Sequence, residues 1–443
     1  MSLLQTRREF LVTGLKGAGL LAASAFVPAF LTRTAAAAGA DKDAPLLVVL
    51  QLSGGNDGLN TVVPFTDDLY FKARPTIGLR GESLFKISDR IALNAALAPL
   101  RREFDSGRMA IIQNTGYPNP NRSHFRSMEI WQTGISDRIE PSGWLGRYFD
   151  AQCCGTDPKE ENQKSGNAEI GISFGKVMPQ SFRNRSNLGL SIDNPETFLW
   201  NASGETESLA KAQQAIFEKL NRPGTGGLSA PATSKNMSMA MLGGMDPGEP
   251  ATADFLRHTA MNAMVAGDRI RNALKKGQSR VEYPASKLGG ELAMISKLIA
   301  ADFPTRVYYA SQGGFDTHAN QLENHARLLG DVAASLAAFM KDLRLRKMSE
   351  RVLILAFSEF GRRVAENASG GTDHGSAAPM FLFGDRVKGG LHGVPPDLEN
   401  LASGDVRHQI DFRQVYAAVL EKWLRTDSGA ILQGSYVPLD VVA

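Results

Sequence analysis

The chain has 443 residues and a formal net charge of +3 at pH 7. Its first 40 residues carry four basic side chains against one acid, which accounts for the whole excess. The remaining chain is therefore near neutral, which argues against a nucleic-acid partner that needs a basic surface, and it is long enough to bury a large core.

The N-terminus has the parts of a twin-arginine signal peptide. Arg7 and Arg8 precede the uncharged stretch 17–31, and the small residues 35–40 offer cleavage sites of the A-x-A type. The apolar stretch is shorter than the ~20 residues of a membrane span, and Pro28 interrupts it. We expect residues 1–40 to direct export by the twin-arginine machinery to the periplasm or the exterior. The mature protein then has no stable membrane span; an uncleaved anchor is the alternative.

From residue 41 onward, apolar strand-like runs alternate with helical patterns, which favours an α/β fold around a mostly parallel sheet. We predict strands at 46–52, 109–113, 188–192, 306–310, 351–357 and 379–383. The clearest helix covers 322–345, and another begins at Asp411, a good N-cap residue. We expect residues 41–443 to form one domain.

Residues at about 200–300 interrupt this pattern. Helical segments at 207–220, 253–276 and 287–300 flank a stretch, 222–252, that is rich in Gly, Pro, Ser and Met. We expect a mostly helical insertion packed on or over the sheet edge. The methionines of 222–252 could line an apolar pocket, or they could simply anchor a flexible loop.

Two acidic residues follow apolar runs at the points where strands end. Asp57 lies in the glycine-rich turn 53–60, and Glu359 follows the run 352–357. Glycine lets the backbone approach a ligand closely, although an Asp-Gly turn is also ordinary loop chemistry. Glu359 could likewise close its strand by pairing with Arg362 instead of binding an ion.

Two Asp–His pairs add imidazole donors. Asp316 and His318 share a short loop after the strand predicted at 306–310, so both can reach one ion. Asp373 and His374 lie in a glycine-rich loop before the last predicted strand, where core packing explains a histidine poorly. Oxygen and imidazole donors that converge at the carboxyl edge of a sheet suit a divalent metal ion such as Zn, Mn, Mg or Ca.

We also expect a helix to begin near Ser123. A serine in this position is ordinarily a cap, but a helix N-terminus also binds anions through its free N–H groups. Beside a metal ion, a serine can act as a nucleophile, and the neighbouring Arg122 or His124 could steady an oxygen of an anionic ester.

Together with the twin-arginine start, the segments SGGNDGLN, RSHF, FDTH, SEFGR and GTDHG resemble an exported bacterial family, domain of unknown function 1501. The likeness covers nearly the whole chain, and that family resembles a branch of the alkaline phosphatase and sulfatase superfamily. The resemblance implies a doubly wound α/β fold, one or two divalent metal ions, and a Ser, Thr or formylglycine nucleophile at a helix start. The cysteine-based formylglycine signature is absent, so a serine is expected.

The resemblance also implies roles for single residues. Asp57 matches a first-strand aspartate that binds one ion, and Ser123 falls at the nucleophile position. Ligands of the other ion are matched by Asp316, His318 and His374.

The segment Glu359-Phe360 departs from the pattern, because it stands where the superfamily has an Asp-His ligand pair. Glu359 can replace the aspartate, but Phe360 cannot replace the histidine; Asp373 could compensate from the neighbouring loop. The resemblance therefore implies one histidine-rich site and one oxygen-rich site, the latter built from Asp57, Ser123 and Glu359.

The leading hypothesis is an exported metal-dependent hydrolase of phosphate or sulfate esters, whether small molecules or glycans, in which Ser123 attacks. The alternative is a catalytically silent relative that serves as a binding or assembly component of the cell envelope, which Phe360 favours. A third hypothesis treats the same residues as polar caps that bind no metal.

Overall fold

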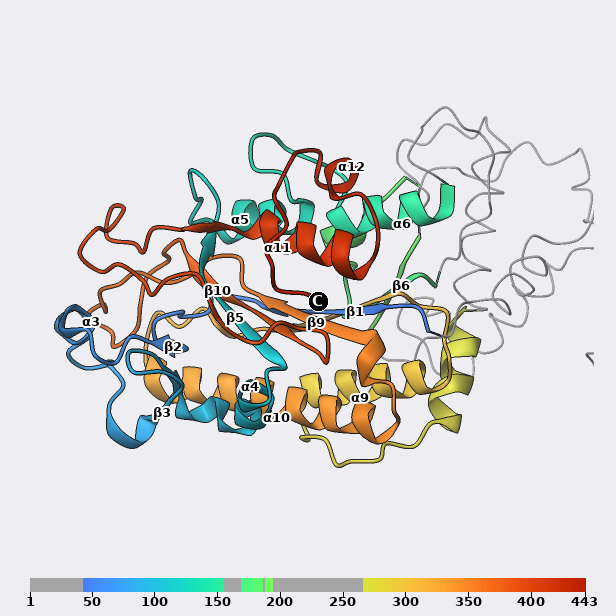
Figure 1. Ribbon diagram of the computed structural model, residues 1–443, viewed down its shortest axis with the longest axis horizontal. Coiled ribbons are helices and arrows are strands. Elements are labelled where there is room, and N and C mark those ends of the chain that lie inside the picture. Colours follow the sequence, from blue (N-terminus) through green and yellow to red (C-terminus); the bar gives the residue numbers. More distant parts are fainter. Residues whose placement is uncertain (1–42, 155–168, 186–187, 194–265) are drawn as a thin grey trace, which may run out of the picture.

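The computed structural model describes residues 43–154, 169–185, 188–193 and 266–443 (Figure 1). The predicted signal, residues 1–40, and most of the predicted insertion at 200–300 lie outside these ranges. A sheet of nine strands forms the centre of the described part, with helices on both of its faces (Figure 1). None of the described helices is long and apolar enough to cross a membrane.

The large sheet is mixed but mostly parallel, as predicted. Its order is β11-β5-β10-β9-β1-β8-β6-β7, and β12 also pairs with β5. The strands are β1 (Leu46–Leu52), β5 (Met109–Gly116), β6 (Gly171–Phe174), β7 (Leu190–Ile192), β8 (Val307–Gln312), β9 (Val352–Phe357), β10 (Ala378–Phe383), β11 (Gly390–His392) and β12 (Ile410–Asp411). Only β10 runs antiparallel to its neighbours among these pairs.

Strand β1 shows why both faces of the sheet are covered. All seven of its residues are buried, and alternate side chains point to opposite faces. Leu46, Val48 and Leu50 belong to one hydrophobic core, and Leu47 and Val49 belong to the other. Such continuous apolar strands need a helical layer on each side.

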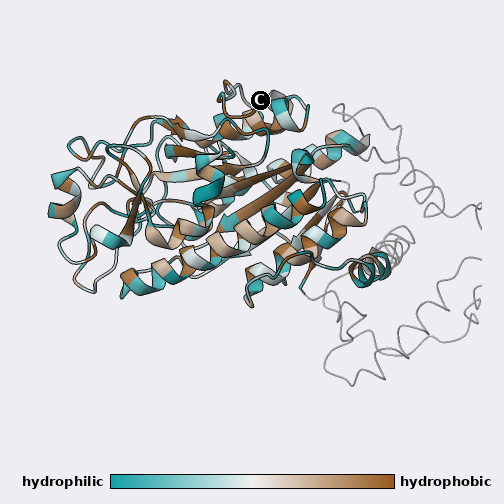
Figure 2. Ribbon diagram, turned by 60° about the horizontal axis from the view of Figure 1, so that its bottom comes forward, coloured by the Kyte–Doolittle hydropathy of each residue, from teal (hydrophilic) through white to brown (hydrophobic). Residues whose placement is uncertain are grey.

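The first layer contains α9 (Lys287–Ala300) and α10 (Gln321–Leu345), and the short α4 (Arg101–Asp105) lies on the same side (Figure 1). The opposite layer contains α5 (His124–Thr133), α6 (Trp144–Cys154), α11 (Phe412–Ala418) and α12 (Ser428–Leu432) (Figure 1). Figure 2 shows mostly hydrophobic strands in the centre and helices that carry both hydrophilic and hydrophobic residues around them.

Smaller elements complete the described chain. A second sheet has the order β2 (Val62–Val63), β4 (Ala92–Asn94), β3 (Leu84–Lys86), and α3 (Asp68–Ala73) lies between β2 and β3 in the chain. Short 3₁₀ turns cover Gly81–Ser83, Ala95–Leu100, Gln180–Phe182 and Ser349–Arg351, and a π turn, Val419–Trp423, continues α11.

The sequence predictions agree best where the apolar pattern is long. The predicted helix 287–300 and strand 46–52 have the observed bounds, and Asp411 caps α11 in a full capping box. Strand β6 and helix α6 were not predicted. Of the predicted helix 253–276, residues 266–276 are described and helical; the rest, and the helix 207–220, lie outside the described residues.

Strand direction brings the candidate loops to one edge of the sheet. Strands β1, β8 and β9 are parallel, so the loops that follow them leave from the same edge. Because β10 is antiparallel to both β9 and β5, the loop before β10 and the loop after β5 lie at this edge too. Five segments that are distant in sequence therefore meet there.

Candidate metal centre

Four side chains from three of these loops converge on one point. The ligand atoms of His124, Asp316 and His374 all lie within 4.8 Å of one another. The Nε2 atom of His318 joins them, at 3.1 Å from the Oδ1 atom of Asp316 and 3.0 Å from the Nε2 atom of His374. Among the residues that the structure describes, His124, Asp316 and His374 form the one group whose ligand atoms all lie this close together, and His318 is a fourth donor outside that group.

The distances within this cluster fit a metal ion. A tetrahedral ion bound at 2.0–2.1 Å holds its ligand atoms about 3.3 Å apart, because the edge of a tetrahedron is ~1.6 times its radius. The Oδ1 atom of Asp316 lies 3.5 Å from Nε2 of His124 and 3.1 Å from Nε2 of His374. The distances of His318 to Asp316 and His374 are similar, although His318 lies outside the group whose ligand atoms are all within 4.8 Å of one another.

The hydrogen bonds of the three imidazole rings fix which nitrogen faces the centre. The Nδ1 atom of His374 lies 2.8 Å from the carbonyl oxygen of Arg122, which can only accept, so Nδ1 carries the proton. The Nδ1 atoms of His124 and His318 face the carboxylates of Glu359 and Asp373 at 2.9 and 3.3 Å. Each Nε2 lone pair then points inward, as in metal-bound histidines.

Two features of the inward nitrogens call for a cation. The Nε2 atom of His124 is buried and has no hydrogen-bond partner. The Nε2 atoms of His318 and His374 face each other at 3.0 Å, a separation that one shared proton or one metal ion bound to both would satisfy. The residues therefore fit a divalent ion on grounds of chemistry as well as distance.

A buried arginine holds the carboxylate ligand in place. Arg362 is fully buried, and its Nη2 atom donates to the Oδ1 atom of Asp316 at 2.6 Å. Burial acts to raise the pKa of Asp316, but the hydrogen bond and charge of Arg362, with His374 and His318, outweigh it and bring the pKa to about 2. Asp316 is therefore a carboxylate at any physiological pH.

Glu359 does not pair with Arg362, and its carboxylate faces the ring of His124. The side chain is fully buried, and its Oε1 atom accepts from the backbone N–H of Gly54 at 2.8 Å and from His124. A buried carboxylate behind a histidine orients the ring and raises its basicity. Asp373 has the same relation to His318, on the exposed side of the centre.

Asp57 lies in a separate buried ion pair. Its Oδ2 atom accepts from Arg74 at 2.6 Å, and neither side chain is exposed to solvent. The Oδ1 atom accepts from the backbone N–H groups of Leu59 and Asn60, and Gln321 donates to Oδ2. Burial acts to raise the pKa of Asp57, but Arg74 and these hydrogen bonds lower it overall. With these donors in place, Asp57 is not in the cluster.

Ser123 occupies the N-cap position of α5, directly before the ligand His124. Its side chain is exposed and makes no capping hydrogen bond. Arg122 is tied to the centre by its backbone, since its carbonyl holds His374, while its guanidinium binds Asp405 at 2.7 Å. Ser123 thus stands at the N-cap position of α5, but its hydroxyl group does not cap the helix.

The sequence that carries this centre matches one known family model. The family model described as "Protein of unknown function (DUF1501)" matches residues 44–432. The chain belongs to this family. No curated protein matches it.

Several solved structures align with this DUF1501 chain. Ps i-CgsB aligns with a TM-score of 0.38 and 10% identity over 89% of this chain and 75% of that one. Alkaline phosphatase from the Antarctic bacterium TAB5 gives 0.31 and 12% over 79% and 95%, and the lipoteichoic acid synthase LtaP from Listeria monocytogenes gives 0.32 and 9% over 91% and 77%. Scores this low carry no argument about function.

Phe360 forms an apolar wall of the DUF1501 centre. Its side chain is buried, and its ring centroid lies 4.9 Å from that of His124 and 4.8 Å from that of His374. Phe360 cannot bind an ion, but His124 brings an imidazole to the same cluster from α5. From the sequence, His124 was expected to contact an oxygen of the ester. Its place in the donor group with Asp316 and His374 was not predicted, although its position directly after Ser123 was an available signal.

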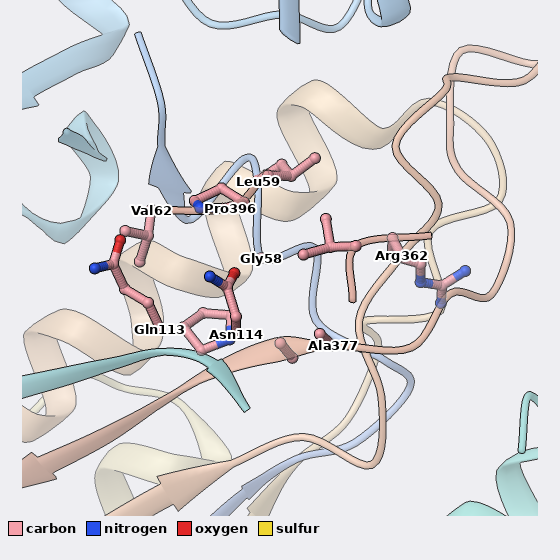
Figure 3. Close-up of a pocket in the computed structure, with 11 residues that line it drawn as sticks. Gly58, Leu59, Val62, Gln113, Asn114, Arg362, Ala377 and Pro396 are labelled. Atoms are coloured by element: carbon pink, nitrogen blue, oxygen red, sulfur yellow. The ribbon is translucent and has the colours of Figure 1, made fainter. Parts of the chain in front are cut away.

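A small pocket lies beside the centre without belonging to it. It is lined by Gly58, Gln113 and Asn114 among others, and Arg362 is its one member that also contacts the cluster. In Figure 3 the guanidinium of Arg362 points away from Gln113 and Asn114. The volume of this pocket is about 20 Å³, which is enough for one water molecule but not for an ester substrate.

Proposed function

We propose that this protein is an exported metal-dependent hydrolase of phosphate or sulfate esters in which Ser123 is the nucleophile. The observation that carries the proposal is the convergence of imidazole nitrogens and the Asp316 carboxylate at the start of α5, where the exposed Ser123 directly precedes His124 in the chain. Structural serine caps hydrogen-bond to their helix, and Ser123 does not. The motifs of the first 40 residues support export to the periplasm or exterior.

The donor set narrows the choice of ion. Three imidazoles and one carboxylate suit Zn²⁺, whereas Mg²⁺ and Ca²⁺ prefer shells of oxygen atoms. We therefore place Zn²⁺ first, ahead of Mn²⁺, with Mg²⁺ and Ca²⁺ disfavoured. We further propose one ion for each chain, because Asp57 and Glu359 use their oxygens within the protein.

The chain's own groups would divide the work as follows. A bound ion would polarise the ester and favour ionisation of the serine hydroxyl. Ser123 would form a bond to the phosphorus or sulfur atom from the start of α5, giving its proton to solvent, while the ester's alcohol leaves with the bonding electrons and takes up a proton; water then hydrolyses the seryl ester, and free N–H groups at a helix start favour the anion. Arg122 donates to Asp405 through Nε and Nη2, which leaves Nη1 as the nitrogen we assign to an oxygen of the ester.

One observation favours the alternative, a silent component of the cell envelope. His318 stands close to Asp316 and His374 as a fourth donor, and a shell closed by four protein ligands is typical of structural zinc, whereas catalytic zinc keeps a position open. In that case the ion would stabilise the loops at the sheet edge and Ser123 would have no chemical role.

Elemental analysis together with ester turnover tests the proposal. The exported wild-type protein should contain about one equivalent of a divalent ion, as a single four-ligand site implies. It should hydrolyse a phosphate or sulfate ester from a panel of small and glycan substrates. Ser123→Ala should abolish turnover and keep the ion, while the control Ser83→Ala, at an exposed turn, should change neither. Equal turnover by wild type and Ser123→Ala would refute the serine mechanism.

A further inference from the structure

We propose that His318 is a displaceable ligand, which leaves the ion when an oxygen of the anionic ester binds. This inference rests on the proposed metal centre and adds the step that opens it. An ion held by His124, Asp316 and His374 would have one further tetrahedral position, for which His318, close to Asp316 and His374 but outside the compact group, and an ester oxygen would compete. The structure shows that the four ligands are not held equally.

The anchors of the three histidines differ in length. His374 donates to a backbone carbonyl at 2.8 Å and His124 to Glu359 at 2.9 Å, both within the usual range for N–H···O bonds. His318 faces Asp373 at 3.3 Å, beyond that range. His318 is therefore the least firmly oriented ring of the three.

The anchors also differ in burial. The side chain of Glu359 is fully buried, whereas that of Asp373 is 58% exposed. The rings themselves follow the same order, at 24% exposed for His374, 31% for His124 and 44% for His318. An exposed hydrogen bond competes with water, so the pair formed by His318 and Asp373 orients its ring less strongly than the buried pair.

Asp316 is as exposed as His318 but is not free to leave. Its Oδ1 atom accepts from Nη2 of the fully buried Arg362, whose Nε and Nη1 atoms each donate to a backbone carbonyl oxygen and whose Nη2 atom also contacts two more. Removing Asp316 from the centre would leave a buried guanidinium without its carboxylate, which is costly. The ligand with the weakest support is thus His318.

The backbone around His318 stays in place when the ring moves. The carbonyl oxygen of His318 accepts from Asn367, and a Cβ at Gly371 would overlap the His318 carbonyl group, which shows how closely the two loops pack. Displacement is therefore a change of side-chain rotamer rather than a loop movement. Such changes at exposed residues are fast compared with typical turnover.

Metal content of three variants gives the first test. His318→Ala should retain about one equivalent of zinc, because three protein ligands suffice for a catalytic site. His124→Ala and His374→Ala should lose the ion under the same dialysis. Loss of zinc by His318→Ala to the same extent would overturn the proposal and make His318 a fixed ligand. Circular dichroism on each variant shows whether it has folded.

Anion binding to the cobalt(II)-substituted protein gives the second test. Visible absorption of cobalt reports its ligands, so titration with inorganic phosphate, and separately with sulfate, measures oxyanion binding at the ion. Phosphate competes with His318 in the wild type and not in His318→Ala. The variant should therefore bind phosphate about tenfold more tightly, because the fraction of chains with an open position rises.

Asp373→Asn provides a graded second variant, since it keeps His318 and removes the charge that orients it. Its phosphate affinity should lie between those of wild type and His318→Ala. A spectrum that neither anion changes in any variant would overturn the proposal. Whichever anion binds identifies the ester class. Ser123→Ala should leave these titrations unchanged, so loss of the serine mechanism and loss of this inference are separate outcomes.

Discussion

Glu359 and His124 are 235 positions apart in the chain, yet the carboxylate of the first accepts a hydrogen bond from the ring of the second at 2.9 Å. Glu359 has no exposed surface, so a buried negative charge is committed to orienting one imidazole. A buried carboxylate is costly unless it is fully partnered. Its presence here indicates that the direction of the His124 ring matters to the centre.

Replacing this carboxylate by an amide should weaken the ion's binding. Glu359→Gln keeps the size of the side chain but removes its charge, and such outer-shell changes typically lower metal affinity about 10–100-fold. Competition with a chelator measures the effect. The exposed Glu350→Gln is the matched control and should bind as wild type does. An unchanged affinity for Glu359→Gln would mean that His124 does not bind the ion.

The ion pair of Asp57 and Arg74 should contribute to stability rather than to metal binding. Arg74→Met leaves a buried carboxylate unpaired, so the free energy of unfolding should fall by about 3–5 kcal/mol. Urea denaturation measures this change. Arg101→Met, which removes an exposed i,i+4 pair, should change it by no more than about 0.5 kcal/mol.

Metal content of the folded Arg74→Met variant separates the two roles of Asp57. If Asp57 is structural, the variant should hold the same amount of ion as wild type. A second equivalent bound by the variant would show instead that Arg74 occupies the place of a cation.

His325 should make stability depend on pH in the weakly acidic range. Burial is the main cause that lowers the pKa of His325, to about 4, although Asp57 acts against it. The folded-state pKa lies below the ordinary 6.5, so the unfolded chain binds more protons between these two values, and stability rises with pH from about 4 to 6.5.

The full contribution of His325, about 3 kcal/mol, is present above pH 6.5 and is lost as pH falls through the window to about 4. Urea denaturation at several pH values measures it. His325→Gln keeps an amide that can donate to Asn56, as the ring does at 2.8 Å, and should remove this part of the slope. If the free energy of unfolding depends on pH equally in variant and wild type between about pH 4.5 and 6.5, His325 is not the group responsible.

Gly55 should tolerate no side chain. Its φ of +79° is a left-handed conformation, and a Cβ there would overlap the ring of Phe360, which packs on two of the ligands. Gly55→Ala should therefore lower stability by about 1–3 kcal/mol and weaken metal binding. Gly290→Ala in helix α9, with open space at its Cβ, should instead stabilise by up to about 1 kcal/mol. Thermal unfolding and metal content report both.

Local sequence patterns were enough to predict the main strands and helices of this protein. Continuous apolar runs give β1 and β9, helical spacing gives α9 and α10, and a capping pattern gives the start at Asp411. These signals are local, because they depend on which side chains recur along a few turns or alternate along a strand. The edge at which the candidate residues gather also followed, since parallel strands place their carboxyl ends together.

Which of the candidate residues gather at the centre depended on the tertiary structure. Asp57 and Glu359 both follow a strand, yet one is held by Arg74 and the other stands behind His124. Whether a carboxylate binds a metal, a guanidinium or an imidazole depends on side-chain direction and burial, which sequence spacing does not contain. His124 joined the cluster because α5 packs across the sheet edge, where its ring meets loops that come from β8 and lead into β10.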